Sequence, residues 1–201
     1  MKGFKTEDSY KAMYYMLEHP KFISRSLSEF YGWPFGGKVV DFVNWLVDLK
    51  LVRKTHETEK GKPRYEVASR AELVNFYSKY RDLNKKIIQT YEIAIDRKSA
   101  IKLIGKNGGI LCLTTALELY GDEYFQDPTI HAYSADPNLL PLMEDQEDGN
   151  TKIILYEYDL ADEIKQKKNV PVTSPNRTII DLFCANLAYA VERFLPKVWL
   201  K

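Results

Sequence analysis

The sequence predicts an α+β protein of two domains. The first 70 residues suggest three short helices followed by a β-hairpin, whereas the last hundred residues alternate helix-like and strand-like runs. A chain of 201 residues can form one large domain or two small ones, and its hydrophobic fraction of 45% is enough for a core in each. The uneven distribution of charge along the chain is a third observation that favours two domains.

The front of the chain is basic and the region behind it is acidic. The formal net charge is only +1, which argues against a protein that binds nucleic acid by bulk electrostatics alone. Residues 1–110, however, hold 21 Lys and Arg against 13 Asp and Glu, a net of +8, and residues 111–168 hold 4 against 13, a net of −9. This asymmetry predicts two different partners, with unevenly charged solvated surfaces as the alternative.

The composition predicts a cytoplasmic protein whose cysteines are reduced. The first nine residues are polar, unlike a secretory signal, and no apolar run approaches the roughly 20 residues that cross a bilayer. We therefore expect a cytoplasmic location and no membrane partner. Cys112 and Cys184 lie far apart in apolar segments, without a second cysteine or a histidine at metal-ligand spacing, so we expect reduced core residues.

Three helices are predicted before residue 50. The first carries apolar residues at helical spacing from Tyr10 to Leu17 and is ended by Pro20. Ser26 and Glu29 have the spacing of a capping box and predict the start of a second, short helix. The third lies within residues 38–50, with an apolar stripe at Val39, Phe42, Val43, Leu46 and Leu49 and an outward face of Lys38, Asp41, Asn44, Trp45 and Asp48.

The segment LVRKTHETEKGKPRYEV, residues 51–67, predicts two short strands, 51–55 and 64–67, joined by a polar turn that contains Gly61. The order helix, helix, turn, helix, hairpin resembles a winged helix-turn-helix over about residues 5–68, and we assign residues 1–69 to such a DNA-binding domain. The resemblance implies that the third helix enters a major groove and that the hairpin tip lies against phosphates or a minor groove. A winged helix used only for protein contacts is the alternative. Lys50 departs from the pattern, since glycine often precedes the wing.

The candidate DNA-binding residues lie on the third helix and the hairpin. Basic side chains around one turn can neutralise phosphates and release their counterions, and asparagine is suited to an adenine edge. Asp41 and Asp48 share the outward face of the helix and would repel the phosphate backbone. The predicted set is Lys38, Asn44, Arg53, Lys54, Lys60, Lys62 and Arg64.

A long connecting helix is predicted over residues 70–96. This segment lacks Gly and Pro, and Leu73, Phe76, Tyr80, Leu83 and Ile87 recur three and four residues apart. Packing on both domains and a homodimer seam are two alternatives, because two heptads are short for a coiled coil. A basic series could extend a DNA-facing surface or form a solvated helix face: Arg81, Lys85, Lys86, Arg97, Lys98, Lys102 and Lys106.

Residues 97–201 predict a mixed α/β domain. A helix ends at Gly108 or Gly109, and a second helix in 113–120 has Thr115 and Glu118 at capping-box spacing. Strand-like runs follow at 129–134, 152–158 and 170–174. In the last helix Ser174 is expected to cap, Pro175 suits the first position, and Arg177 can reach Asp181 as a structural pair.

Two segments of this domain, LTTALELYG (113–121) and VPVTSPNRTIIDLF (170–183), are similar to the C-terminal domain of AbiEi-type antitoxins, regulators of type IV toxin-antitoxin systems. The resemblance implies that the N-terminal domain binds the operon's own promoter and that the C-terminal domain counters a nucleotidyltransferase-like toxin. Asn176 departs from the pattern, where family members often carry an acidic residue. The matching residues are Thr115, Ala116, Leu117, Tyr120, Gly121, Ser174, Pro175, Arg177, Thr178 and Asp181.

No sequence pattern points to an enzyme. There is no phosphate-binding loop or nucleophile elbow, and His19, His56 and His131 sit alone in the sequence. We expect no catalytic residue, no cofactor and no metal. Glu163 and Lys165, with Asp159 before them, faintly resemble a metal-dependent nuclease site, but that stretch is predicted to be helical rather than the edge of a sheet.

Taken together, these patterns predict a DNA-binding transcriptional regulator of the AbiEi-like antitoxin type. Its expected partners are double-stranded DNA, a nucleotidyltransferase-like toxin and, as an alternative use of residues 70–96, a second copy of the chain. A stand-alone winged-helix transcription factor whose C-terminal domain dimerises or senses a ligand is the main alternative, and the nuclease is the other.

Overall fold

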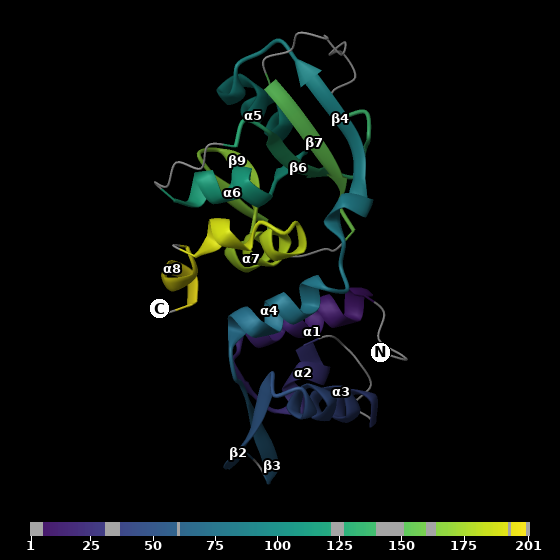
Figure 1. Ribbon diagram of the computed structural model, residues 1–201, viewed down its shortest axis with the longest axis vertical. Helices are drawn as coiled ribbons and strands as arrows, with labels where there is room; N and C mark the ends of the chain where they lie inside the picture. The colour runs from purple at the N-terminus through teal and green to yellow at the C-terminus, as the bar shows by residue number, and fades with distance from the viewer. Residues whose placement is uncertain are drawn as a thin grey trace. The chain divides into compact units, whose positions relative to one another are not determined.

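A computed structural model describes residues 6–30, 37–59, 61–121, 127–139, 151–159, 164–192 and 194–199. The chain divides into two compact units, Met1–Arg81 and Asp82–Lys201 (Figure 1). Each unit contains both helices and a β-sheet, so the predicted α+β class is confirmed.

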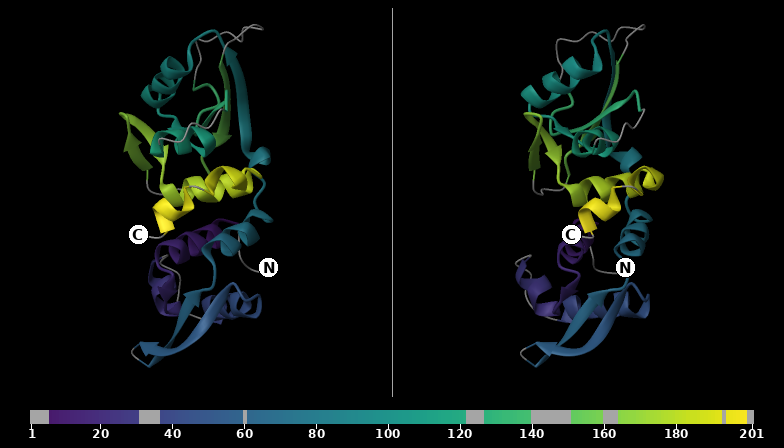
Figure 2. Two further views of the ribbon diagram at one scale, coloured as in Figure 1. Left: turned by 60° about the vertical axis from the view of Figure 1, so that its left-hand side comes forward. Right: turned by 90° about the vertical axis from the view of Figure 1, so that its left-hand side faces the viewer.

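The first unit combines a small antiparallel sheet with helices. The sheet has the order β1-β3-β2, and the short strand β1, which the sequence did not predict, pairs Phe22 with Tyr65. Figures 1 and 2 show that the ribbon of β2 and β3 extends past the helices of this unit. In chain order the elements are α1 (Thr6–Glu18), β1 (Lys21–Phe22), α2 (Ser24–Phe30), α3 (Gly37–Asp48), β2 (Val52–Glu59), β3 (Lys62–Val67) and α4 (Arg70–Ser78).

The apolar stripe of α3 packs as predicted for four of its five residues. Val39, Phe42, Val43 and Leu46 are buried, whereas Leu49 lies after the last turn and is 40% exposed. Lys50 has a φ of 61°, in the left-handed region that glycine adopts most easily. The turn at Lys50 therefore keeps the backbone geometry of a glycine, and Leu51 N donates to Leu46 O at 3.0 Å to join α3 to the ribbon.

The helix α2 begins two residues earlier than predicted. Ser26 lies inside the helix, so the predicted capping box is wrong, and Glu29 instead pairs with Arg25 one turn before it. This exposed pair joins Arg25 Nε and a carboxylate oxygen of Glu29 at 2.8 Å.

The long helix predicted over residues 70–96 is also wrong. The helix α4 ends at Ser78, a 3₁₀ turn η1 spans Leu83–Lys86, and Ile87–Ile93 form strand β4. Asp82 begins the turn because its carboxylate accepts a hydrogen bond from Asn84 N at 3.1 Å. The three-part division into 1–69, 70–96 and 97–201 is therefore replaced by two units that meet at Arg81 and Asp82.

The second unit is built on a mixed six-stranded sheet of the order β4-β7-β6-β5-β9-β8. The pairs β6–β7 and β5–β9 are parallel and the other three are antiparallel. The strands β4, β5 and β8 were not predicted as strands. The elements are η1, β4, α5 (Arg97–Lys106), β5 (Ile110–Leu111), α6 (Leu113–Tyr120), β6 (Ile130–Ser134), β7 (Thr151–Glu157), β8 (Ile164–Lys167), β9 (Val170–Thr173), α7 (Pro175–Cys184), η2 (Ala188–Val191) and α8 (Leu195–Trp199).

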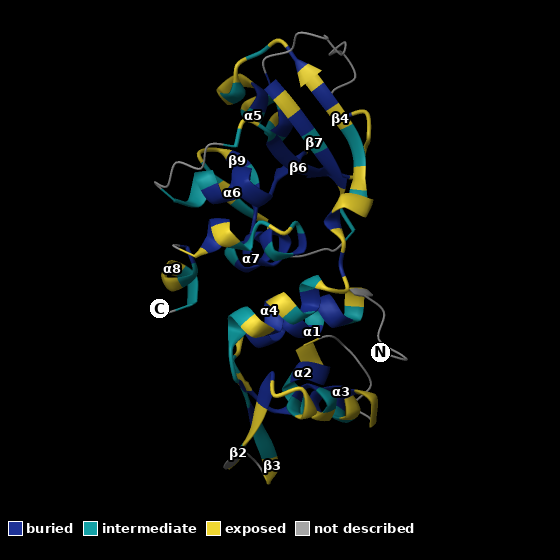
Figure 3. Cartoon of the chain, viewed as in Figure 1, coloured by how far each residue is buried: buried dark blue, intermediate teal, exposed yellow. Residues whose placement is uncertain are grey.

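The two faces of this sheet differ in chemistry. On one face Ile130 and Ala132 of β6 join a hydrophobic core that includes Ala100 and Ile104 of α5. Because side chains alternate along a strand, His131 and Tyr133 of β6 lie on the opposite face. Figure 3 shows β6 buried along its whole length, so this second, polar and aromatic face is buried as well.

The helix α7 starts as the sequence predicts. Ser174 Oγ accepts from Arg177 N at 3.2 Å, and Pro175 occupies the first helical position. The helix α8 contacts this start, since Trp199 Nε1 donates to Asn176 Oδ1 at 2.9 Å. Cys112 and Cys184 are both buried and are not joined in a disulfide, as predicted. Among the described residues, no helix is long and apolar enough to cross a membrane.

Candidate functional site

Four of the predicted DNA-binding residues lie together on the β2–β3 ribbon. Arg53 and Lys54 are exposed on β2, Lys62 is exposed at the start of β3, and Arg64 is half-buried. The pairing register sets Lys54 opposite Tyr65, and the ladder is irregular between Lys54 and Thr58. Lys60 lies outside the described residues. Gly61 has a φ of 71°, which a turn at the ribbon tip requires and which glycine adopts without strain.

The strand register also brings one carboxylate to the ribbon. Glu66 is the partner of Arg53 across the ladder, so the charge of Arg53 faces an opposite charge on the same side of the ribbon. Lys54 lies opposite Tyr65 in the ladder, and Lys62 is paired with Glu59 near the tip of the ribbon. The ribbon is therefore basic but carries its own acidic side chains, which limit its net positive field.

The remaining two candidates lie on α3. Lys38 and Asn44 are both exposed, and so are Asp41 and Asp48, while the opposite side of the helix is buried in the unit. The exposed face of α3 thus combines one cation, two carboxylates and one amide. The structure separates the candidate set into a basic ribbon and a mixed, net acidic helix face.

Trp45 belongs to an aromatic cluster and not to the ribbon. Its ring lies 5.4 Å from that of Phe76 on α4 and 6.0 Å from that of Phe42. Phe76 in turn contacts Tyr80 with ring centroids 5.3 Å apart. The tryptophan that the sequence assigned to the outward face of α3 is therefore half-buried by α4.

A second set of basic side chains lies on α5 of the second unit. Lys98, Lys102 and Lys106 are exposed and recur every four residues, so they form one stripe of the helix. Arg97, which begins the same helix, is tied instead to Glu118 of α6 at 2.7 Å. The basic series predicted from residue 81 to residue 106 is thus not aligned on one helix: Arg81 is buried beyond the end of α4, and the other members lie on η1 and α5.

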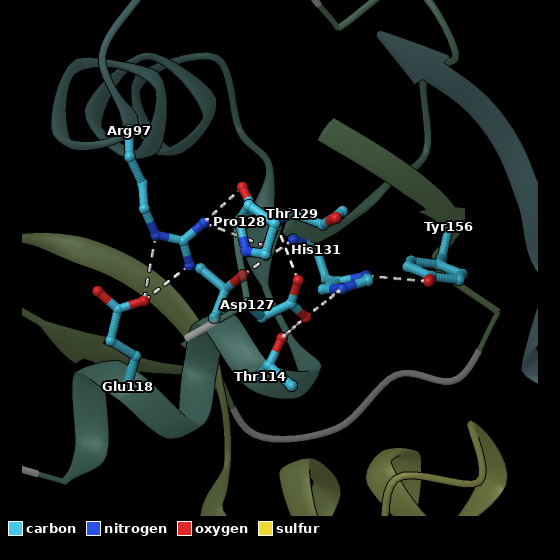
Figure 4. A network of polar contacts seen from close by, with 9 residues as sticks. Arg97, Thr114, Glu118, Asp127, Pro128, Thr129, His131 and Tyr156 are labelled. Atoms are coloured by element: carbon cyan, nitrogen blue, oxygen red, sulfur yellow. Dashed lines mark hydrogen bonds and ion pairs between the residues drawn. The ribbon is translucent and has the colours of Figure 1, made fainter. Parts of the chain in front are cut away.

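The second unit contains a polar network that was not predicted from the sequence (Figure 4). One carboxylate oxygen of Asp127 accepts from Thr114 Oγ1 at 2.7 Å and lies 3.1 Å from His131 Nε2. His131 Nδ1 lies 3.0 Å from the hydroxyl of Tyr156 on β7. His131 therefore has two partners, and the prediction that it stands alone is wrong.

Further hydrogen bonds extend this network to residues 127–129, just before β6. Arg97 donates to the carbonyl oxygens of Pro128 and Thr129 at 3.3 and 3.1 Å, and Thr129 N donates to Asp127 at 2.9 Å (Figure 4). The predicted capping box of Thr115 and Glu118 is wrong, because both side chains have other partners. Thr115 Oγ1 accepts a hydrogen bond from His131 N at 2.9 Å, and Glu118 accepts one from Arg97. These hydrogen bonds fix residues 127–129, which lead into β6.

The electrostatics of the network follow from its hydrogen bonds and its burial. Burial raises the pKa of Asp127, but hydrogen bonds from His131, Thr114 and the amide of Thr129 outweigh burial and hold that pKa well below its usual range. Burial likewise raises the pKa of the Tyr156 hydroxyl above its ordinary value, so Tyr156 stays neutral. The neutral hydroxyl of Tyr156, the ring of His131 and the ionised carboxylate of Asp127 therefore form a structural chain of hydrogen bonds.

Asp127→Asn is expected to flatten the loss of stability that acid causes. Because the pKa of Asp127 is lower in the folded protein than the usual value of about 4, its carboxylate contributes stability above that pH. As the pH falls from about 4 toward the folded pKa, the unfolded chain takes up the proton first and the contribution is lost. Thermal melting followed by circular dichroism between about pH 6 and pH 2 measures this dependence.

The matched control is Asp136→Asn, which removes an exposed carboxylate of the same unit. This variant should keep the wild-type dependence of the melting temperature on pH. If Asp127→Asn and the wild type lose stability in parallel as the pH falls, the carboxylate of Asp127 does not carry the acid sensitivity.

The predicted pair of Arg177 and Asp181 is confirmed and is fully buried. Arg177 Nε lies 2.9 and 2.8 Å from the two carboxylate oxygens of Asp181, and both side chains have an exposed fraction of 0%. The guanidinium lies over the ring of Tyr133 at 4.8 Å and is 3.6 Å from Asp159. Lys86 extends this charge network, since its ammonium group lies 3.4 Å from Asp159.

The residues considered for a nuclease are arranged differently from the prediction. Lys165 lies on strand β8 at the edge of the sheet and not on a helix. Asp159 is engaged by Lys86 and Arg177, and Glu163 lies outside the described residues. Within the described ranges no group of three or more His, Cys, Asp or Glu side chains could hold a metal ion.

Comparisons with protein-family models, curated proteins and solved structures found no match for this chain.

Proposed function

We propose that this protein is a DNA-binding transcriptional regulator of the AbiEi-like antitoxin type. In this proposal the first unit binds promoter DNA as a winged helix-turn-helix, and the second unit binds a protein partner, a nucleotidyltransferase-like toxin. Double-stranded DNA is the partner for which the geometry offers the more direct support.

The observation that carries the proposal is the position of the basic ribbon relative to α3. In the first unit, α3, which is buried on one side, is followed by a tight turn at Lys50 and then by the two-stranded ribbon. The ribbon extends past the helices (Figure 2), and its side chains Arg53, Lys54 and Lys62 are exposed. In a winged helix-turn-helix this order sets the helix into a major groove and the ribbon along the adjacent backbone. Positive side chains at that position can neutralise phosphates.

The role proposed for the second unit rests on the resemblance of its two sequence motifs to AbiEi-type antitoxins. Thr115, Arg177 and Asp181 of those motifs are buried. Thr115 accepts a hydrogen bond from β6, Arg177 packs on Tyr133 of β6, and Asp181 pairs with Arg177 within α7. The motif residues thus support a shared architecture for this unit. The surface that meets the toxin in this proposal is formed by other residues.

A gel shift with the gene's own upstream region tests the proposal. Specific protein–DNA complexes typically have dissociation constants of about 10⁻⁸–10⁻¹¹ M at physiological salt and exceed non-specific binding by about 10³-fold or more. We expect a complex with the upstream duplex in this range and much weaker binding to a scrambled duplex of the same length. Equal affinity for the two duplexes would contradict a promoter-specific regulator.

The neighbouring genes distinguish the antitoxin from a stand-alone regulator. A nucleotidyltransferase-like toxin gene beside this one is expected for an antitoxin, and co-expression of the protein should relieve the growth arrest that the toxin causes. A gene neighbourhood without such a toxin would favour the stand-alone winged-helix factor. Plasmid DNA incubated with the protein and magnesium should remain intact, and cleavage would favour the nuclease.

A further inference from the structure

We infer that Asp41 and Asp48 make α3 discriminate between DNA sequences. In this inference Asp41 accepts a hydrogen bond from the exocyclic amino group of a cytosine in the major groove. This inference rests on the proposed function and names the side chains that give the DNA interface its sequence preference. It assigns a role to the two carboxylates that appear at first to oppose DNA binding.

The geometry of α3 sets these carboxylates on one line. Asp41 and Asp48 are seven residues apart, which is close to two full turns, and Asn44 lies between them on the same exposed face. The line is about 10 Å long at 1.5 Å per residue, which corresponds to about three base pairs. Three side chains that can accept hydrogen bonds are therefore presented together on the side of α3 that is not buried.

The charges on this face do not serve the stability of the helix. Lys38 lies in the first turn and Asp48 in the last, and both positions oppose the helix dipole, which favours acidic residues at the start and basic residues at the end. Among the described residues neither Asp41 nor Asp48 has an ion-pair partner within 4.0 Å. Local rules that a sequence breaks without a compensating contact often mark a functional surface.

Hydrogen-bond chemistry restricts what these carboxylates can accept in a groove. An ionised carboxylate only accepts, and the donors on base edges in the major groove are the amino groups of cytosine and adenine. Aspartate pairs with the cytosine amino group, whereas asparagine such as Asn44 suits adenine. Against phosphates or acceptor-rich base edges, the same carboxylates repel the DNA.

The two parts of the candidate interface therefore have opposite tasks. The basic ribbon attracts any duplex, and the carboxylates of α3 disfavour every sequence that does not present an amino group at the right position. Repulsion of wrong partners is a general route to specificity. A low net charge of +1 for the whole chain fits a protein that avoids strong non-specific binding to DNA.

Selection of bound duplexes from a random pool tests this inference. We expect the wild-type protein to enrich duplexes with a cytosine at a fixed position. Asp41→Asn should lose that preference by about tenfold or more, since a good side chain–base pair gives discrimination of this order. The variants Asp41→Asn and Asp48→Asn should also bind unrelated duplexes more tightly than the wild type does, because each removes a negative charge that faces the DNA.

The matched control is Glu72→Gln, which removes an exposed carboxylate from α4 of the same unit. It should enrich the same sequences as the wild type, and circular dichroism should show that all variants remain folded. If the wild type and Asp41→Asn enrich the same sequences, the inference is overturned while the proposed function stands. If the wild type enriches no sequence, the proposed function itself is contradicted.

Discussion

Replacement of Arg53, Lys54 and Lys62 with glutamine is expected to weaken binding to every DNA sequence by about 100- to 1,000-fold at about 0.1 M salt. The three side chains are exposed on the ribbon, where each can neutralise one phosphate and release its counterions. Because the slope of log K against log salt scales with the number of phosphates neutralised, the slope should fall by about 2.7. Gel shifts at four or five salt concentrations measure both quantities.

A variant that keeps the charges provides the control for this result. Arg53→Lys, Lys54→Arg and Lys62→Arg together should bind with nearly the wild-type salt dependence, because phosphate neutralisation depends on charge more than on the side chain that carries it. A triple glutamine variant with the wild-type salt slope would show that the ribbon does not touch the DNA backbone. Loss of affinity for one sequence alone would instead indicate base readout by these residues.

Asp181→Ala is expected to lower the free energy of unfolding by about 3–5 kcal/mol. Arg177 and Asp181 are both completely buried and lie 2.8 Å apart, so removal of the carboxylate takes the nearest counter-charge from a guanidinium that water cannot reach. The contact of that guanidinium with the ring of Tyr133 at 4.8 Å does not replace the lost charge. Urea denaturation followed by circular dichroism measures the change.

A double variant and an exposed pair give this prediction its controls. Arg177→Met with Asp181→Leu should cost less than the sum of the single variants, because it leaves no buried charge behind. Glu29→Ala breaks a pair with the same spacing and the same 2.8 Å distance, but one whose side chains are 62% and 64% exposed. It should cost at most about 1 kcal/mol. Equal costs for Asp181→Ala and Glu29→Ala would show that burial does not determine the strength of this pair.

Local signals allowed several helices to be predicted from the sequence. In α7 the cap at Ser174, Pro175 and the pair of Arg177 and Asp181 all lie within about two turns, so each could be inferred without knowledge of the tertiary structure. Pro20 similarly marked the end of α1. The hairpin was predicted from Gly61 and its flanking polar residues, although both strands are longer than expected.

The segment 70–96 was mispredicted because two elements happen to continue one periodicity. Leu83 and Ile87 extend the three- and four-residue spacing of α4, but they belong to the 3₁₀ turn and to strand β4. The alternation of buried Tyr91 and Ile93 with exposed Glu92 is a strand signal that the helical interpretation overlooked. Residues 70–96 contain no Gly or Pro to mark the break, which is made by the cap at Asp82.

The polar network of the second unit could not be predicted from spacing alone. Thr114, Asp127 and Tyr156 come from a helix, a connection and a distant strand, and it is the sheet pairing of β6 with β7 that brings Tyr156 to His131. The alternation in TIHAYS was the one usable signal, because it sets His131 and Tyr133 on the same face. For the candidate DNA site, the sequence identified the basic residues, and the structure divided them between the ribbon and α3.

Trp45 and Trp199 give each unit an intrinsic fluorophore in a defined environment. Trp45 lies against Phe76 in the first unit, and the indole nitrogen of Trp199 is bound to Asn176 in the second. The chain has three tryptophans, so replacing Trp33 and one of the other two with phenylalanine leaves a single tryptophan. Fluorescence spectra of two such variants would follow the unfolding of the two units independently and show how strongly they cooperate.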